Sequence, residues 1–113
     1  FTLSECQQQV VLVNFRASRC RPCVQEIPSL HRLQAKIKNP AFSIITINVG
    51  ENRERIGRFL ERVPMELPLL TDDDGKVSTD WKIYVYPSSY LVDRQGNYAR
   101  LTLEHSNGIQ RKL

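Results

Sequence analysis

Two cysteines separated by two residues, Cys20 and Cys23, are the side chains of this sequence best suited to chemistry. They follow an apolar run and precede an amphipathic segment, so we expect them where a buried strand gives way to a helix. Two thiols at positions i and i+3 of a helix start can close a small disulfide ring that exposes the first sulfur and shields the second. The positive end of the helix dipole should stabilise the Cys20 thiolate, and Arg19 and Arg21 should act in the same sense. Pro22 suits the first helical turn. The spacing therefore favours a redox-active dithiol.

Other uses of the same two cysteines stay open. A metal-binding or metallochaperone module would also use a Cys-x-x-Cys pair, but a structural zinc site needs four ligands. The remaining candidates, Cys6, His31 and His105, form no recognisable ligand pair. Two inert thiols are a further alternative, whereas a peroxidase is disfavoured because the sequence has no Thr-x-x-Cys segment. The position of the pair between a strand and a helix favours redox chemistry.

The surrounding pattern predicts the elements that position these cysteines. The order is strand, helix, strand, helix, short helix, strand, strand, which indicates an α/β fold that is parallel first and antiparallel at the end. We expect strands at 10–15, 42–49, 88–92 and 98–103, and helices from the cysteines to Asn39-Pro40, around 56–63 and around 77–81. Residues 71–75 (TDDDG) read as a turn or helix entry. Residues 93–97 (DRQGN) read as a turn in which Gly96 and Asn97 take positive φ.

Length and composition indicate one soluble globular domain covering residues 1–113. Hydrophobic residues make up 41% of the chain, and the 11 Gly and Pro residues are too few for a disordered or low-complexity segment. No apolar run approaches the roughly 18 residues that a membrane helix needs. The chain begins with Phe1 rather than Met, so we expect any signal peptide or lipid anchor to lie upstream.

Charge argues against a nucleic-acid partner. Sixteen Lys and Arg residues against twelve Asp and Glu give a net charge of +4, and the cations are scattered along the chain. The one dense group alternates Arg53, Arg55, Arg58 and Arg62 with Glu51, Glu54 and Glu61. Its spacing predicts the i,i+4 pairs Glu51–Arg55 and Glu54–Arg58 on a solvated helix face.

Several motifs in the same order resemble one known family. The segment VVLVNFRASRCRPCVQEIPSL resembles the active-site region of the TlpA/ResA-like branch of the thioredoxin superfamily. FTLSE is similar to that family's entry strand, FSIITINV to its second core strand, and YPSSYLVDRQGN to its cis-proline segment. The resemblance implies a thioredoxin fold, a central mixed β-sheet flanked by helices. It also implies a bacterial thiol–disulfide oxidoreductase, a class that is extracytoplasmic and often membrane-anchored.

The resemblance assigns roles by position. Cys20 would be the nucleophile and Cys23 the resolving thiol of a redox-active disulfide. Glu26 matches the glutamate that tunes their protonation, although it could be an ordinary exposed helix residue. Pro87 matches a cis-proline facing the dithiol, which would leave the backbone at Tyr86 free to pair with a substrate strand. Arg19 and Arg21 are further expected substrate contacts. Pro28 matches a proline that kinks the first helix.

Three features depart from the family pattern. Arg16 and Arg19 stand where the family usually has tryptophan. We expect this added positive charge to make the couple more oxidising, or to favour acidic partners, unless both are neutral changes at exposed positions. Cys6 stands where a buried aliphatic residue is expected, and we interpret it as a small packed hydrophobe. The family ends in a longer helix, and only residues 108–113 remain here, so we expect a truncated or atypical end.

The resemblance also implies the partners. We expect exchange with protein thiols and disulfides, and a membrane-bound or soluble electron donor or acceptor. No cofactor is expected beyond the cysteine pair, and no nucleic acid. The expected state is a monomer in the periplasm or anchored facing it. The expected direction is reducing, in electron transport to cytochrome c maturation or envelope redox maintenance.

Overall fold

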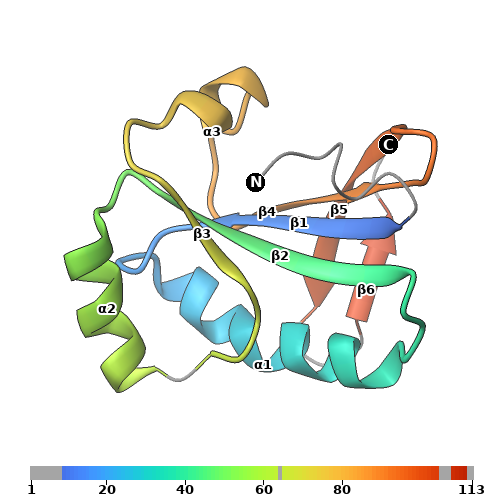
Figure 1. Cartoon of the computed structure of the whole chain (residues 1–113), viewed down its shortest axis with the longest axis horizontal. Helices are drawn as coiled ribbons and strands as arrows, with labels where there is room; N and C mark the ends of the chain where they lie inside the picture. The colour runs from blue at the N-terminus through green and yellow to red at the C-terminus, as the bar shows by residue number, and fades with distance from the viewer. Residues whose placement is uncertain (1–8, 64, 105–107, 112–113) are drawn as a thin grey trace.

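A six-stranded mixed sheet forms the centre of the molecule (Figure 1). The computed structural model describes residues 9–63, 65–104 and 108–111. Its elements, in chain order, are β1 (Val10–Arg16), α1 (Arg21–Lys36), β2 (Phe42–Val49), α2 (Arg53–Arg62), β3 (Leu69–Asp72), α3 (Lys76–Asp80), β4 (Ser88–Val92), β5 (Tyr98–Glu104) and β6 (Gly108–Arg111). The strands lie in the order β3-β2-β1-β4-β5-β6.

The sheet is parallel on one side of β1 and antiparallel on the other. β1 pairs with β2, and β2 with β3, in parallel, whereas β4, β5 and β6 are each antiparallel to the preceding strand in the sheet. In the register, Val13 of β1 lies between Ile45 of β2 and Tyr90 of β4. This arrangement confirms the predicted α/β class and its change from parallel to antiparallel pairing.

Alternate residues of the strands supply two separate hydrophobic clusters, one on each face of the sheet. Successive side chains of a strand point to opposite faces. Odd-numbered residues of β1 join one cluster with Ile83 and Trp81, which lie after α3. Leu12 joins the other cluster with Leu30 of α1. Figure 1 shows α1 and α3 on opposite sides of the sheet. The even-numbered face of β1 is therefore the face that carries the cysteine helix.

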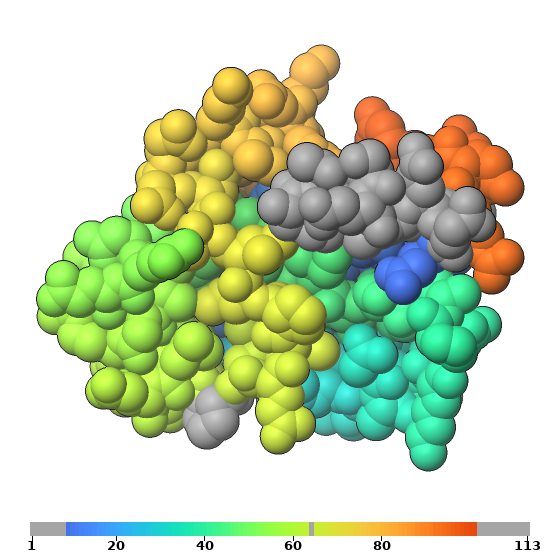
Figure 2. All heavy atoms as spheres, in the orientation of Figure 1, coloured from blue at the N-terminus to red at the C-terminus, as the bar shows by residue number. Residues whose placement is uncertain are grey.

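The helix α1 begins where the sequence predicts and ends slightly earlier. Cys20 is its N-cap and Pro22 lies in its first turn, while Ile27 and Leu30 are buried. The last backbone hydrogen bond runs from Ile37 N–H to a carbonyl within the helix, before Asn39-Pro40. The helix α2 packs Ile56 and Phe59 inward and forms one end of the molecule, at the left in Figures 1 and 2.

Two edge strands depart from the sequence prediction. Asp72 belongs to β3 rather than to a turn, and its carboxylate also accepts the backbone N–H groups of Val77 and Ser78 at 3.1 and 2.9 Å. The interpretation of 71–75 as a helix entry is thus correct for Asp72, but it misses the strand. The short segment of β6 pairs with β5 as a strand, in a part of the chain where the sequence predicts no element and where we expect a truncated or atypical end.

The turn between β4 and β5 is formed differently from the prediction. Gly96 has a φ of +86°, as predicted, but Asn97 does not take positive φ. Asn97 instead donates its backbone N–H to Asp93 Oδ1 at 2.9 Å and its side-chain amide to Oδ2. Burial would raise the pKa of Asp93, but these bonds, together with those from the backbone N–H groups of Gln95 and Gly96, lower it overall.

Candidate active site

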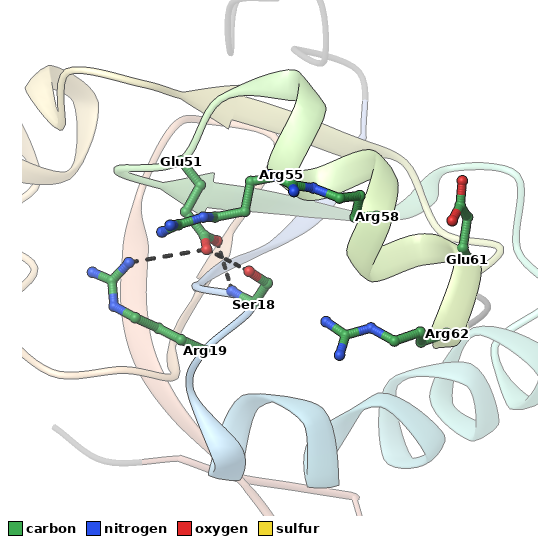
Figure 3. A pocket seen from close by; sticks show the side chains of 7 residues that line it. All are labelled: Ser18, Arg19, Glu51, Arg55, Arg58, Glu61 and Arg62. Carbon is green, nitrogen blue, oxygen red and sulfur yellow. Dashed lines mark hydrogen bonds and ion pairs between the residues drawn. The ribbon is translucent and has the colours of Figure 1, made fainter.

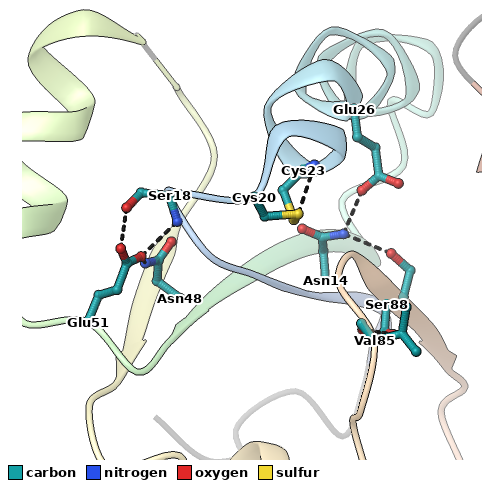
Figure 4. Close-up of a disulfide and its surroundings, with 10 residues drawn as sticks. Asn14, Ser18, Cys20, Cys23, Glu26, Asn48, Glu51, Val85 and Ser88 are labelled. Carbon is teal, nitrogen blue, oxygen red and sulfur yellow. Dashed lines mark hydrogen bonds between the residues drawn. A yellow bond between two sulfur atoms is a disulfide. The ribbon is translucent and has the colours of Figure 1, made fainter.

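Cys20 and Cys23 form a disulfide at the N-terminus of α1 (Figure 4). Their Cα atoms are 5.2 Å apart. Cys20 caps the helix, because its Sγ accepts the Cys23 backbone N–H at 3.3 Å. Cys23 is 1% exposed, whereas Cys20 is half-buried. The predicted ring and its unequal exposure are therefore confirmed, and the sulfur open to attack is the one that lies at the positive end of the helix.

Glu26 is a buried carboxyl group one helical turn beyond Cys23. It is 6% exposed, and its Oε1 accepts a hydrogen bond from Asn14 Nδ2 at 2.8 Å. The same amide of Asn14 donates to Ser89 Oγ at 2.9 Å. Figure 4 shows Glu26 directed toward Asn14 beneath the disulfide-bearing turn. The alternative of an ordinary exposed helix glutamate is wrong, because this face of α1 packs on β1.

The Tyr86–Pro87 peptide bond is cis, as the resemblance implies. Ser88, the next residue, begins β4 and pairs with Phe15 near the end of antiparallel β1. Pro87 therefore lies at the end of the sheet where β1 leads into residues 17–20, which we call the cysteine loop. The Tyr86 side chain is half-buried against the hydrophobic cluster on the α3 face. Contact of Pro87 and Tyr86 with a substrate stays a prediction.

Arg16 is wholly buried, which corrects the prediction of an exposed positive charge. It is 0% exposed, its Nη1 donates to Met65 Sδ at 3.2 Å, and its guanidinium lies 5.3 Å from the centre of the Phe59 ring. Nε and Nη2 have no hydrogen-bond partner among the described residues. Burial lowers the pKa of Arg16, opposed by the charges of Glu26 and Glu51. Arg16 is an even-numbered residue of β1, so it lies on the face of the sheet that carries α1 and contacts Phe59 of α2.

Glu51 is a second buried carboxyl group near the cysteine loop. It accepts the Ser18 backbone N–H at 2.7 Å, the Ser18 hydroxyl and the Asn48 side-chain amide. Arg19 Nη1 lies 3.9 Å from Glu51 Oε2. Burial would raise the pKa of Glu51, but the hydrogen bonds from Ser18 and Asn48 and the charge of Arg19 lower it overall. The carboxylate thus holds the segment that leads into Cys20.

The role of Glu51 is absent from the sequence prediction, which pairs it with Arg55. The structure forms no such ion pair, because α2 begins at Arg53 with Asn52 as its N-cap and Glu51 lies before it. One signal was available. Glu51 closely follows β2, and the carboxyl ends of adjacent parallel strands meet at one edge of a sheet. That edge also carries the loop after β1.

The two arginines beside Cys20 are both exposed, with different surroundings. Arg19 is 66% exposed and reaches across to Glu51, whereas Arg21 is the first residue of α1. Neither arginine is withdrawn from the surface around the disulfide. Their predicted contact with substrate is therefore sterically open, and it stays a prediction.

The described residues contain neither a metal-binding cluster nor a membrane-spanning helix. Within the described ranges, no group of three or more His, Cys, Asp or Glu side chains is arranged to hold a metal ion. His31 Nε2 accepts the Glu66 backbone N–H at 3.3 Å. Cys6 and His105, named in the sequence prediction, lie outside the described residues. No helix in the described part of the chain has the length and apolar content to cross a bilayer.

Comparisons with known proteins agree with this geometry. The AhpC/TSA family matches residues 1–99. The chain is 27% identical over 99 residues to thiol-disulfide oxidoreductase ResA of Geobacillus kaustophilus, covering 88% of this chain and 57% of that protein. It is 26% identical over 98 residues to thioredoxin-like protein YneN of Bacillus subtilis, covering 84% and 56%. The chain thus spans little more than half the length of these curated relatives.

Solved structures show the same similarity. A crystal structure described as thiol:disulfide interchange protein DsbE from Chlorobium tepidum superposes with a TM-score of 0.79 at 32% identity, covering 85% of this chain and 68% of that one. A structure of DsbF of Mycobacterium tuberculosis superposes with a TM-score of 0.78 at 21% identity, covering 88% and 74%. The second likeness bears on the fold alone.

Proposed function

This chain belongs to the AhpC/TSA family, on its TlpA/ResA-like branch with a thioredoxin fold, and from that premise we propose that it exchanges disulfides with protein substrates. The single observation that carries the proposal is the disulfide at the start of α1, with Cys20 half-buried and Cys23 closed off. The more exposed sulfur of Cys20 can react with a substrate, and the shielded sulfur of Cys23 lies within reach to release that substrate afterwards.

The proposed reduction of a substrate proceeds in two exchanges. The Cys20 thiolate attacks one sulfur of a substrate disulfide, so that a Cys20–substrate bond forms while the other substrate sulfur leaves as a thiolate and is protonated. The Cys23 thiol then loses its proton and attacks Cys20 Sγ, which releases the second substrate sulfur as a thiol. Two electrons pass to the substrate, and the Cys20–Cys23 disulfide forms. A dithiol donor must reduce that disulfide before the next cycle.

In this scheme Glu26, a buried carboxyl group one helical turn beyond Cys23, takes up the proton that Cys23 loses. General acid–base groups contribute about 10²–10⁴-fold to a rate, so we expect Glu26→Gln to slow the second exchange by about 10²-fold near neutral pH. The attack of Cys20 on a disulfide should keep its rate. Stopped-flow measurement of mixed-disulfide formation and decay separates the two steps. Glu54→Gln, at an exposed position of α2, serves as the control. An equal loss in both steps would show a structural role only.

The reduction potential tests the proposal directly. The protein is equilibrated in graded glutathione or dithiothreitol buffers, and the thiols of Cys20 and Cys23 are counted by alkylation and mass spectrometry. We expect one two-electron transition, and a value near or below about −250 mV would fit the reducing direction. A value above about −180 mV would place the protein with oxidants and isomerases. Stoichiometric metal with no disulfide under mild oxidant would instead support the metal-binding alternative.

The wider setting of the proposed activity is inferred from the family resemblance. We infer an extracytoplasmic protein, in the periplasm or anchored facing it, that acts as a monomer without a bound cofactor. Its electrons would come from a membrane-bound or soluble dithiol donor. Delivery of electrons to cytochrome c maturation or to envelope redox maintenance fits the reducing direction. Oxidised substrate that accumulates in a strain lacking this gene, trapped by alkylation in the cell envelope, would identify the target protein.

A further inference from the structure

A cleft rich in arginine opens between the cysteine loop and α2 (Figure 3). Its volume is about 770 Å³. The lining side chains are those of Ser18, Arg19, Glu51, Arg55, Arg58, Glu61 and Arg62. Four guanidinium groups against two carboxylates leave a formal excess of two positive charges, and none of the described residues that line the cleft is aromatic.

The described carboxylates of the arginine cleft do not form ion pairs with the arginines of α2. The hydrogen bonds from Ser18 and Asn48 and the contact with Arg19 occupy the carboxylate of Glu51. Among the described residues, Arg55, Arg58 and Arg62 form no ion pair. The two intrahelical pairs predicted from the sequence do not form either: Glu51 lies outside α2, and Glu54 contacts no arginine within ion-pair distance. Three guanidinium groups of α2 therefore remain available to an external anion.

The arginine cleft shares the segment that leads into the disulfide, because Ser18 and Arg19 line it. Arg19 immediately precedes Cys20, so their Cα atoms are only about 3.8 Å apart. Along α2, the seven helical steps from Arg55 to Arg62 span roughly 10 Å, which is the length of about three extended residues. About three or four residues adjacent to a substrate cysteine that reacts with Cys20 are therefore long enough to extend along the arginines of α2.

We propose that the arginine cleft binds an acidic segment of the redox partner, adjacent to the partner cysteine that exchanges with Cys20. The inference rests on the proposed disulfide exchange and specifies its substrate. Guanidinium groups bind carboxylates in a planar, bidentate manner, and a row of them along one helix suits several carboxylates in sequence. A single-stranded nucleic acid is disfavoured, because such sites add aromatic side chains on which bases stack.

The test compares three peptides that differ only beside their cysteine, which is carried as a neutral mixed disulfide with 2-mercaptoethanol. Glutamate, glutamine or lysine occupies the four positions on each side. Because electrostatic steering changes association rates by about 10–10³-fold, we expect reduced protein to react at least about 10-fold faster with the glutamate peptide than with the glutamine peptide in low salt. The lysine peptide should be slowest. About 0.5 M salt should remove most of the preference, since the Debye length is then only a few ångströms.

Two triple variants locate the effect. Arg55→Gln, Arg58→Gln and Arg62→Gln together should abolish the preference for glutamate, with the Gln side chains retaining helix propensity. The matched control changes three exposed cations outside the cleft, Lys38→Gln, Arg53→Gln and Arg94→Gln, and removes the same net charge. The control should keep the preference. Circular dichroism checks that both triple variants remain folded.

Each other outcome is informative. Equal rates for the three peptides, or equal loss of preference in both triple variants, would overturn the proposal. Stronger inhibition by a single-stranded oligonucleotide than by polyglutamate of equal charge would overturn it as well. Reaction with neutral bis(2-hydroxyethyl) disulfide is measured in parallel. If that reaction also fails, the disulfide exchange itself is wrong, whereas normal reaction with no glutamate preference removes the cleft proposal alone.

Discussion

Cys20→Ser should abolish disulfide exchange, lowering turnover with a protein disulfide by about three orders of magnitude or more, since the attacking thiolate is removed. Cys23→Ser should behave differently. Its Cys20 can still attack a substrate, but the shielded thiol that releases the product is gone, so a stable mixed disulfide should accumulate. Mass spectrometry of the intact adduct distinguishes the two variants.

The third cysteine provides the control for this experiment. Both variants are best made in a Cys6→Ser background, so that no other thiol of the chain can resolve the adduct. Cys6→Ser alone should retain turnover, in keeping with the interpretation of Cys6 as a packing residue. Turnover by Cys20→Ser at the normal rate, or capture of substrate through Cys23, would reverse the assignment of nucleophile and resolving thiol.

Glu51→Ala should lower the free energy of unfolding by about 3–5 kcal/mol, the usual cost of removing one partner from a buried charged network. The substitution leaves the Ser18 N–H and the Asn48 amide without their acceptor, and it removes one of the two carboxylates that oppose the buried charge of Arg16. Because domains are stable by only about 5–15 kcal/mol, this is a large fraction of the total. Urea unfolding at neutral pH measures it.

The stability should also depend on pH through this carboxyl group. The pKa of Glu51 is lower in the folded protein than in the unfolded chain, where a glutamate titrates near about 4.3. Its stabilisation is therefore complete above that value and is lost as the pH falls through the folded-state pKa. The difference in unfolding free energy between wild type and Glu51→Gln should be constant from neutral pH down to about 5 and shrink below it.

A neighbouring glutamate shows whether the effect belongs to the buried site. Glu54→Ala changes an exposed residue of α2 and should alter stability by less than about 0.5 kcal/mol. If Glu51→Ala proves equally mild, or if the gap between wild type and Glu51→Gln widens as the pH falls, the carboxylate does not hold the cysteine loop in the way described.

The features that the sequence predicted well depend on local rules. The β-branched run of β2 is bounded by Pro40 and Gly50, and both of its ends were predicted correctly. The start of α1 follows from an N-cap, a proline and periodic apolar residues, and the Cys20–Cys23 ring needs only three residues of chain. A role for Glu26 in tuning the protonation of the cysteines was expected only through the family resemblance.

The features that were missed depend on distant partners. β3 has only four residues, and its Asp72 resembles a turn residue until the N–H groups of α3 are beside it. Glu51 and Arg55 have helical spacing, but Glu51 precedes the N-cap of α2 and accepts hydrogen bonds from Ser18 and Asn48 instead. A local pattern cannot reveal which of two competing partners a side chain will take.

The sequence by itself thus determined the class of fold, the cysteine pair and its position at a helix start, since each depends on periodicity and capping within a few residues. Only the tertiary structure decided the surroundings of that pair. The strand order places the ends of β1 and β2 together, so that Ser18 meets Glu51 and Arg19 faces α2. Alternation along β1 turned Arg16 inward, because what covers a strand face is set by distant helices and not by neighbours in the chain.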